Sequence, residues 1–184
     1  MDGSANQNAR VFNIFLSDLK ISGHFLPEGT HNKGDYASNF ILPGLKSQEY
    51  VLKYNMSQGS GTKLLVRLLK ASDGTQLFKK SYSIPGTSKM PFLIHKAVSD
   101  VNNVLQYPSI SWINRYVVYA VYTTPGRSEI RLADYTFNYK KTIIKGGLNL
   151  FPKWADAKQR SVYYTSYREL IPTLYKLNIY NGSK

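Results

Sequence analysis

Histidine and serine are the residues of this sequence most suited to chemistry, because the chain contains no cysteine. The three histidines, His24, His31 and His95, fall in different predicted elements and lack the spacing of metal ligands. We expect His95 at the surface or boundary of a helix. The Gly-Ser-Gly at 59–61 lacks the lysine of a phosphate-binding loop, and no Gly-x-Ser-x-Gly nucleophile motif occurs. The sequence therefore predicts no enzyme activity, no metal and no cofactor.

The charge of the chain is strongly positive, with 24 basic and 11 acidic residues and a net charge of +13. A nucleic-acid surface is one interpretation, and Tyr139 followed by Lys140 and Lys141 has the residue types that stack on bases. The basic residues are spread along the chain without a dense tract, and these aromatics follow the period of a strand. For the charge, a basic proteome or an acidic partner is therefore the favoured interpretation, and for the aromatics it is ordinary sheet packing.

Targeting signals are missing from the sequence itself. The first ten residues are polar, so they do not form a signal peptide. No apolar run approaches the roughly 20 residues that span a bilayer. We expect a protein that does not span a membrane and that is either cytosolic or secreted with its targeting segment removed.

Any site must be positioned by helices and strands, and the first of these is a helix predicted at residues 9–21, where apolar residues recur at helical spacing. Three strands are predicted at 49–57, 62–71 and 76–84, joined by short turns, the second of which contains Asp73-Gly74. A second helix follows Pro85-Gly86, with Thr87 or Ser88 as its cap, and ends near Tyr107. Residues 1–108 are thus predicted to form an α+β domain, an antiparallel meander with two helices.

A repeat begins beyond Pro108. Strands are predicted at 115–122, 129–135 and 140–145, and the pattern returns at 160–167 and 174–179. Equivalent residues such as Tyr119 and Tyr164 lie 45 apart, and Asp134 and Asn178 lie 44 apart. Periods of about 40–45 residues with several strands per unit are typical of β-propeller blades. Residues 109–184 are therefore predicted to be the first one to two blades of an incomplete all-β propeller, with a plain antiparallel sheet as the alternative.

The first repeat is followed by Pro152-Lys153-Trp154 and then by Ala-Asp-Ala-Lys at residues 155–158. Together with segments 17–25, 50–82, 95–100 and 129–135, this stretch resembles the TolB family, the periplasmic propeller proteins of the Tol–Pal envelope system. Pro152 and Trp154 match the start of the family's Pro-x-Trp-Ser-Pro-Asp-Gly blade signature, whereas residues 155–158 depart from it, which alters the tight turn. Residues 17–25, 50–82, 95–100 and 129–135 are similar to the family's first helix end, three strands, second helix and first blade, in that order. The resemblance covers nearly the whole chain.

The resemblance implies a scaffold that binds the Pal lipoprotein and other Tol proteins in the periplasm, serving outer-membrane integrity and cell division. It implies no small-molecule substrate and no nucleic acid. Two parts of the family have no counterpart here: the extreme N-terminal segment, which engages TolA, and most of the six blades. We therefore expect a fragment that binds Pal more weakly than the whole protein. The alternatives are the non-catalytic N-terminal part of a propeller-bearing peptidase and a basic nucleic-acid-binding module.

The expected partner-binding element is the loop between the two repeats. The resemblance places such loops on the face of the propeller that contacts Pal, and apolar loop residues make good interface anchors. The alternative role for Leu150 and Phe151 is to pack between the blades. The candidate partner-binding residues are Leu148, Asn149, Leu150, Phe151 and Pro152.

Overall fold

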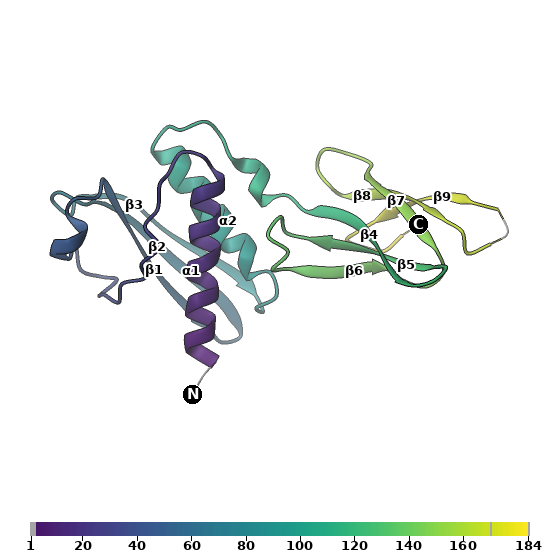
Figure 1. Ribbon diagram of the computed structural model, residues 1–184, viewed down its shortest axis with the longest axis horizontal. Helices are drawn as coiled ribbons and strands as arrows, with labels where there is room; N and C mark the ends of the chain where they lie inside the picture. The colour runs from purple at the N-terminus through teal and green to yellow at the C-terminus, as the bar shows by residue number, and fades with distance from the viewer. Residues whose placement is uncertain (1–2, 170, 184) are drawn as a thin grey trace. The chain divides into compact units, whose positions relative to one another are not determined.

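The computed structural model describes residues 3–169 and 171–183. The chain divides into two compact units, residues 1–114 and residues 115–184. Figure 1 shows helices and a three-stranded sheet in the first unit and only strands in the second. An α+β part is therefore followed by propeller-like sheets, as predicted.

The first unit is built on an antiparallel meander. Strands β1 (Tyr50–Gln58), β2 (Gly61–Lys70) and β3 (Gln76–Pro85) pair in the order β1-β2-β3. The β1–β2 hairpin is tight, since Gln58 pairs with Thr62. Gly74 adopts a φ of +75° in the β2–β3 turn, and a Cβ added there would lie only 2.5 Å from the Asn39 carbonyl oxygen. The turn predicted from Asp73-Gly74 is thus confirmed, and only glycine satisfies both of its constraints.

Two helices, α1 (Gly3–Ile21) and α2 (Met90–Val104), pack on each other and across one face of this sheet (Figure 1). The buried stripe of α1 has helical spacing, with Val11, Ile14, Phe15 and Asp18 pointing inward. The core on the sheet side comes from alternate residues of β2. The buried β2 residues on this face are Leu64, Val66 and Leu68.

The start of α2 differs from its prediction. Lys89 occupies the N-cap position and no side chain bonds the free N–H groups, so neither Thr87 nor Ser88 provides the expected side-chain cap. Pro91 in the first turn explains why the helix begins here, since proline has no N–H to satisfy and its φ is already helical. Short 3-10 helices lie at η1 (Pro43–Leu45) and η2 (Ser111–Asn114), the latter inside the first unit.

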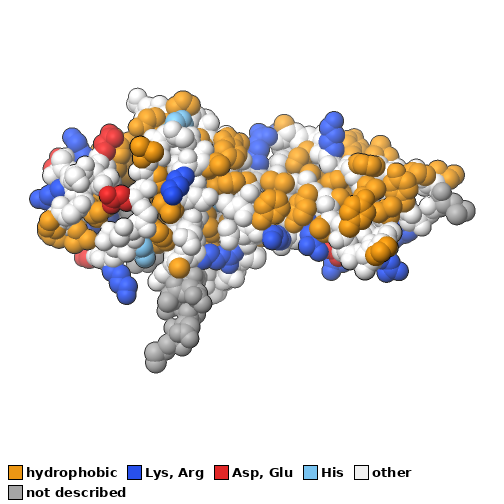
Figure 2. All heavy atoms as spheres, viewed as in Figure 1, with side chains coloured by type: hydrophobic (Ala, Val, Ile, Leu, Met, Phe, Trp, Pro, Cys, Tyr) orange, Lys and Arg blue, Asp and Glu red, His pale blue; other side chains and the backbone are white. Residues whose placement is uncertain are grey.

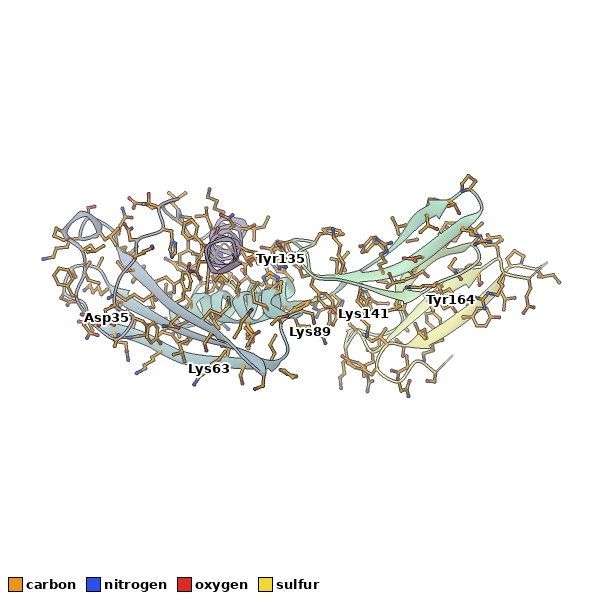
Figure 3. The ribbon with its side chains drawn as sticks, turned by 90° about the horizontal axis from the view of Figure 1, so that it is seen from below. Asp35, Lys63, Lys89, Tyr135, Lys141 and Tyr164 are labelled. Carbon is orange, nitrogen blue, oxygen red and sulfur yellow. The ribbon has the colours of Figure 1, made fainter. Side chains whose placement is uncertain are left out.

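The second unit contains two three-stranded antiparallel sheets. Strands β4 (Val117–Thr124), β5 (Arg127–Ala133) and β6 (Lys140–Ile144) form one, in that order. Strands β7 (Asn149–Trp154), β8 (Ser161–Ser166) and β9 (Thr173–Asn178) form the other. The core between them comprises Ile130, Ile144, Tyr164 and Leu177. Figure 3 shows Tyr164 where the two sheets face each other.

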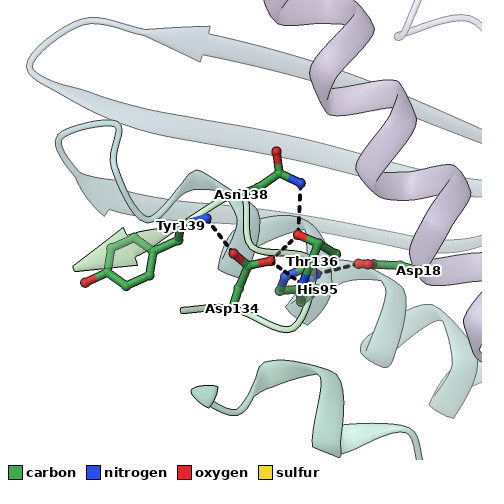
Figure 4. Close-up of polar contacts among 6 residues, drawn as sticks. All are labelled: Asp18, His95, Asp134, Thr136, Asn138 and Tyr139. Atoms are coloured by element: carbon green, nitrogen blue, oxygen red, sulfur yellow. Dashed lines mark hydrogen bonds and ion pairs between the residues drawn. The ribbon is translucent and has the colours of Figure 1, made fainter. Parts of the chain in front are cut away.

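The sequence repeat has a structural counterpart in two turns. At the end of β5, Asp134 Oδ2 accepts a hydrogen bond from the Thr136 N–H at 2.9 Å, and Oδ1 accepts one from the Tyr139 N–H (Figure 4). At the end of β9, Asn178 Oδ1 accepts the corresponding bond from the Tyr180 N–H, also at 2.9 Å. Both side chains therefore close the same kind of Asx turn after equivalent strands.

Candidate functional site

The predicted partner-binding segment, residues 148–152, lies mostly in a strand. β7 begins at Asn149 and pairs with β8, with Asn149 opposite Ser166 and Leu150 opposite Thr165. The expectation of a loop here was therefore wrong. The actual turn is shorter and ends just before Leu148, because Gly146 and Gly147 have φ angles of +78° and +70° and reverse the chain there.

The start of β7 is fixed to the first sheet of the second unit by Ser128 and Asn149, both of which are buried. The Asn149 N–H donates to Ser128 Oγ at 2.7 Å, and that hydroxyl donates to the Asn149 carbonyl. The Asn149 side-chain amide donates to the Gly146 carbonyl at 2.8 Å, and the Ser128 N–H donates to the Gly147 carbonyl at 3.0 Å. Asn149 thus holds the backbone of the segment in place.

Arg168 supports the same turn from the far end of β8. Its guanidinium donates to the Lys145 carbonyl at 3.3 Å, and its Cβ would lie 3.3 Å from a Cβ added at Gly147. The Tyr167 N–H donates to the Leu148 carbonyl at 2.8 Å, which extends the pairing of β7 and β8 by one step. The backbone before Phe151 is therefore held on both sides.

Phe151 lies in a β-bulge. Leu150 pairs with Thr165 and Lys153 with Tyr163, so Phe151 and Pro152 together oppose the single residue Tyr164. Phe151 has a φ of +54°, a left-handed conformation that costs an ordinary residue roughly 1–2 kcal/mol. Strain of this kind persists where surrounding structure imposes it, and it is common at functional sites.

The bulge presents the Phe151 side chain to solvent. It is 69% exposed and has no ring partner among the described residues. Phe137, the other phenylalanine with positive φ, is different because its ring packs edge-on against Tyr119 at 5.4 Å. Of the five predicted residues, Phe151 is therefore the one that offers a large apolar surface.

The remaining predicted residues, Leu148, Leu150 and Pro152, are half-buried. In β8, opposite the bulge, the ring of Tyr164 stacks on Tyr175 with centroids 5.5 Å apart. Burial raises the pKa of Tyr164, and the neighbouring Tyr175 raises it further, so the phenol stays neutral.

The three histidines lie apart within the first unit. His95 was expected at a surface or boundary, but it is completely buried and its Nδ1 lies 2.7 Å from Asp18 Oδ2 (Figure 4). His24 Nδ1 lies 2.7 Å from Asn102 Oδ1, and His31 Nε2 lies 3.0 Å from the Tyr54 hydroxyl. Each histidine therefore has a structural contact of its own.

Among the residues that the structure describes, no group of three or more histidines and carboxylates is placed to hold a metal ion. In the same residues, no helix has the length and hydropathy needed to cross a membrane.

Tyr139 is buried, with its ring 6.0 Å from Tyr116, as the sheet-packing interpretation of residues 139–141 predicted.

Sequence reasoning missed Ser128 and Arg168 as supports of the segment. Ser128 lies 21 residues from Asn149, and neither residue belongs to a motif that marks the contact. The contact between Ser128 and Asn149 depends on how the two sheets of the second unit pack, which the sequence does not show.

Proteins with curated names match this chain in sequence over most of its length. The Tol-Pal system protein TolB of Wolinella succinogenes is 40% identical over 176 residues, which is 94% of this chain and 42% of that protein. The protein of the same name from Helicobacter hepaticus is 41% identical and covers 97% of this chain, and that of Campylobacter jejuni is 32% identical. The chain spans about 43% of the length of the Helicobacter relative. No protein-family model matches the sequence.

Solved structures agree on the fold. The crystal structure of TolB from Acinetobacter baumannii superposes with a TM-score of 0.72 at 19% identity, covering 94% of this chain and 45% of that one. At that identity the match concerns the fold alone, an α+β part followed by propeller-like sheets. Over nearly its whole length, this chain is therefore a homologue of the TolB proteins of the Tol–Pal system.

Proposed function

We propose that this chain acts as a TolB protein of the Tol–Pal system, a non-enzymatic scaffold that binds Pal and other Tol proteins. The proposal includes a periplasmic location and a role in outer-membrane integrity and cell division. The observation that carries it is the 40–41% identity to proteins named Tol-Pal system protein TolB over 94–97% of this chain.

The proposed contact with Pal is made by residues 148–152, with Phe151 as its anchor. An exposed aromatic ring on a backbone that is already ordered loses little conformational entropy on binding. Aromatic side chains are also enriched among the residues that carry most of the energy of protein interfaces. Asn149 contributes by fixing the backbone through its bonds to Ser128 and Gly146.

The proposed affinity of residues 1–184 for Pal is lower than that of a complete TolB. Stable interfaces bury about 800 Å² on each partner, which is more than a five-residue segment with one fully presented ring supplies. The matched region spans only 42–43% of the relatives, so their remaining sequence is free to supply further contacts.

Binding to the Pal protein of the same organism, without its lipid anchor, tests the proposal. Pal is immobilised and the dissociation constants of the unmodified chain, Phe151→Ala and Tyr122→Ala are measured by biolayer interferometry. Tyr122 is the matched control, since it is also 69% exposed and lies in the second unit. We expect Phe151→Ala to weaken binding about tenfold, or roughly 1.4 kcal/mol.

Tyr122→Ala is expected to leave the dissociation constant within about twofold of the unmodified chain. Equal losses in the two variants would remove residues 148–152 from the interface. A complete lack of binding to Pal by the unmodified chain at millimolar concentration would count against the scaffold function itself.

A further inference from the structure

A cavity of about 610 Å³ lies within the first unit, between α1, β1 and the segment of residues 24–45. Ligand sites in proteins commonly have volumes of about 300–1,000 Å³ and mostly apolar walls with a few polar groups. None of the residues 148–152 lines this cavity, so a ligand bound here is independent of the proposed Pal contact.

Two groups of stacked aromatic rings line the cavity. In the first, Phe15 stacks on Tyr54 with centroids 4.9 Å apart, and Phe12 stacks on His31 at 5.1 Å. In the second, Tyr107 stacks on His24 at 5.1 Å. These rings are held by one another, so the walls are ordered before any ligand arrives.

Two lining residues present large apolar side chains to solvent. Leu26 is 99% exposed and Phe40 is 64% exposed. Neither contributes to the core of the unit, because little of either side chain is buried. They extend the apolar surface beyond the mouth of the cavity, as side chains of a docking surface do.

The edge of the sheet also borders the cavity. β1 is an edge strand, and its residues 50–54 line the cavity. Within the described part of the chain, no backbone hydrogen bond joins β1 to residues 24–48. An edge strand with free N–H and C=O groups is a template for an added strand, and several peptide-binding domains use such an edge.

The segment that faces β1 is fixed by two cations. Lys53 Nζ donates to the carbonyls of Asp35, Ser38 and Phe40 at 3.1, 2.7 and 3.0 Å. Arg67 donates to the carbonyls of Tyr36 and Ala37 at 2.7 and 2.8 Å. The three donors of the Lys53 ammonium are thus occupied, and the segment cannot fold away from the strand without breaking these bonds.

The rim carries negative charge on a chain whose net charge is +13. Glu28, Asp35 and Glu49 line the cavity, are exposed, and form no ion pair among the described residues. Of the described lining residues, Lys33 is the only lysine or arginine besides Lys53. Figure 2 shows acidic side chains on the first unit near this region, and Figure 3 labels Asp35 there. The lining thus has three carboxylates against two lysines, a net charge of −1 that favours a basic over an acidic ligand.

We propose that this cavity and the free edge of β1 form a docking site for an extended peptide segment in which apolar and basic residues alternate. The peptide backbone pairs with β1, its apolar side chains enter the aromatic cavity, and its lysine or arginine side chains face the three carboxylates. Alternation suits this arrangement because successive side chains of a strand point to opposite faces.

The probe for this site is the peptide acetyl-Lys-Val-Lys-Leu-Lys-Val-Lys-amide, titrated into the ¹⁵N-labelled chain of 184 residues and followed by NMR. The expected result is a set of shift changes concentrated at the amides of residues 50–54, with affinity that falls as salt screens the rim charges. A control peptide with glutamate in place of every lysine is expected to bind at least tenfold more weakly. A second control with proline at the central position loses a strand N–H and is expected to bind more weakly too.

Matched variants separate the charges from the apolar wall. The combined variant Glu28→Gln, Asp35→Asn and Glu49→Gln keeps each side-chain shape, and we expect roughly tenfold weaker binding from the loss of three exposed charge pairs. Asp73→Asn removes an exposed carboxylate outside the cavity and is expected to change nothing. Leu26→Ala removes apolar surface at no cost to folding, since the side chain is 99% exposed, and is expected to weaken binding severalfold.

Several results would overturn the proposal. Absence of binding by the basic peptide, shift changes outside the first unit, or equal binding of the acidic peptide would each exclude the site as described. An unchanged affinity in the triple variant would exclude the role of the rim. Concentration-dependent shifts at residues 50–54 without peptide would assign the edge to a second copy of the chain instead.

Discussion

Replacing Ser128 by alanine tests whether the structure around residues 148–152 is held as described. The Ser128 hydroxyl accepts from the Asn149 N–H at 2.7 Å and donates to the Asn149 carbonyl, and both residues are buried. Ser128→Ala removes both bonds and leaves two buried backbone groups without this partner. Each such group costs about 1–3 kcal/mol, so we expect a loss of about 2–6 kcal/mol in the stability of the second unit.

The matched control is Ser166→Ala. Ser166 is also buried and lies opposite Asn149 in β8, but its hydroxyl accepts only a 3.4 Å contact from the Arg168 N–H. We expect this variant to lose less than about 1 kcal/mol, since a single weak bond is removed.

Amide hydrogen exchange measured by NMR is the assay, because it reports the stability of each unit separately. Ser128→Ala is expected to speed exchange throughout β5, β7 and β8 while leaving the first unit unchanged. A loss in Ser128→Ala no larger than that in Ser166→Ala would refute the inference that Ser128 holds Asn149 in place.

Three other substitutions test separate parts of the structure. Asp18→Ala removes the buried partner of His95 and is expected to destabilise the first unit by roughly 3 kcal/mol in urea unfolding; a loss below about 1 kcal/mol would contradict the importance of this pair. Burial acts to raise the pKa of Asp100, but hydrogen bonds from Lys80, Lys96 and a tyrosine outweigh it and lower that pKa below its ordinary value. The stability that this carboxylate contributes is therefore present above its unfolded pKa and is lost as pH falls through its lowered folded pKa. We expect Asp100→Asn to destabilise the chain at pH 6 and to lose less additional stability than the unmodified chain between pH 6 and pH 3. Equal loss of stability in the two proteins over this pH range would contradict the prediction. Phe151→Val places a β-branched residue at positive φ and is expected to lower the melting temperature relative to Phe151→Gly, whereas the opposite order would exclude strain at the bulge.

Much of the first unit follows from local sequence patterns. The helical spacing at residues 9–21 and the alternation in residues 49–84 reflect surfaces that must be buried on one side. Both helices and all three strands therefore lie near their predicted positions, although α1 already begins at Gly3 and α2 begins only at Met90. The Asp73-Gly74 turn was predictable because positive φ restricts the choice of residue. The repeat also carried through to structure, down to the equivalent turns at Asp134 and Asn178.

The features that the sequence did not reveal depend on contacts between distant segments. Phe151 and Pro152 form a bulge that interrupts the alternation of inward and outward side chains along β7. The sequence of β7 therefore lacks the period of a strand and was interpreted as a loop. The burial of His95 depends on Asp18, 77 residues earlier in the chain, and nothing near either residue indicates the pair. The cavity beside β1 likewise depends on the path of residues 24–45, which have no periodic pattern of their own.

Site-specific photocrosslinking tests most directly whether this chain serves the Tol–Pal system through residues 148–152. Benzoylphenylalanine is placed at position 151, or at the equally exposed position 122, in the protein expressed in its own organism. After irradiation, crosslinked products are probed for Pal. We predict a Pal adduct from position 151 and none from position 122; a Pal adduct of equal yield from both positions, or from neither, would contradict the proposed contact.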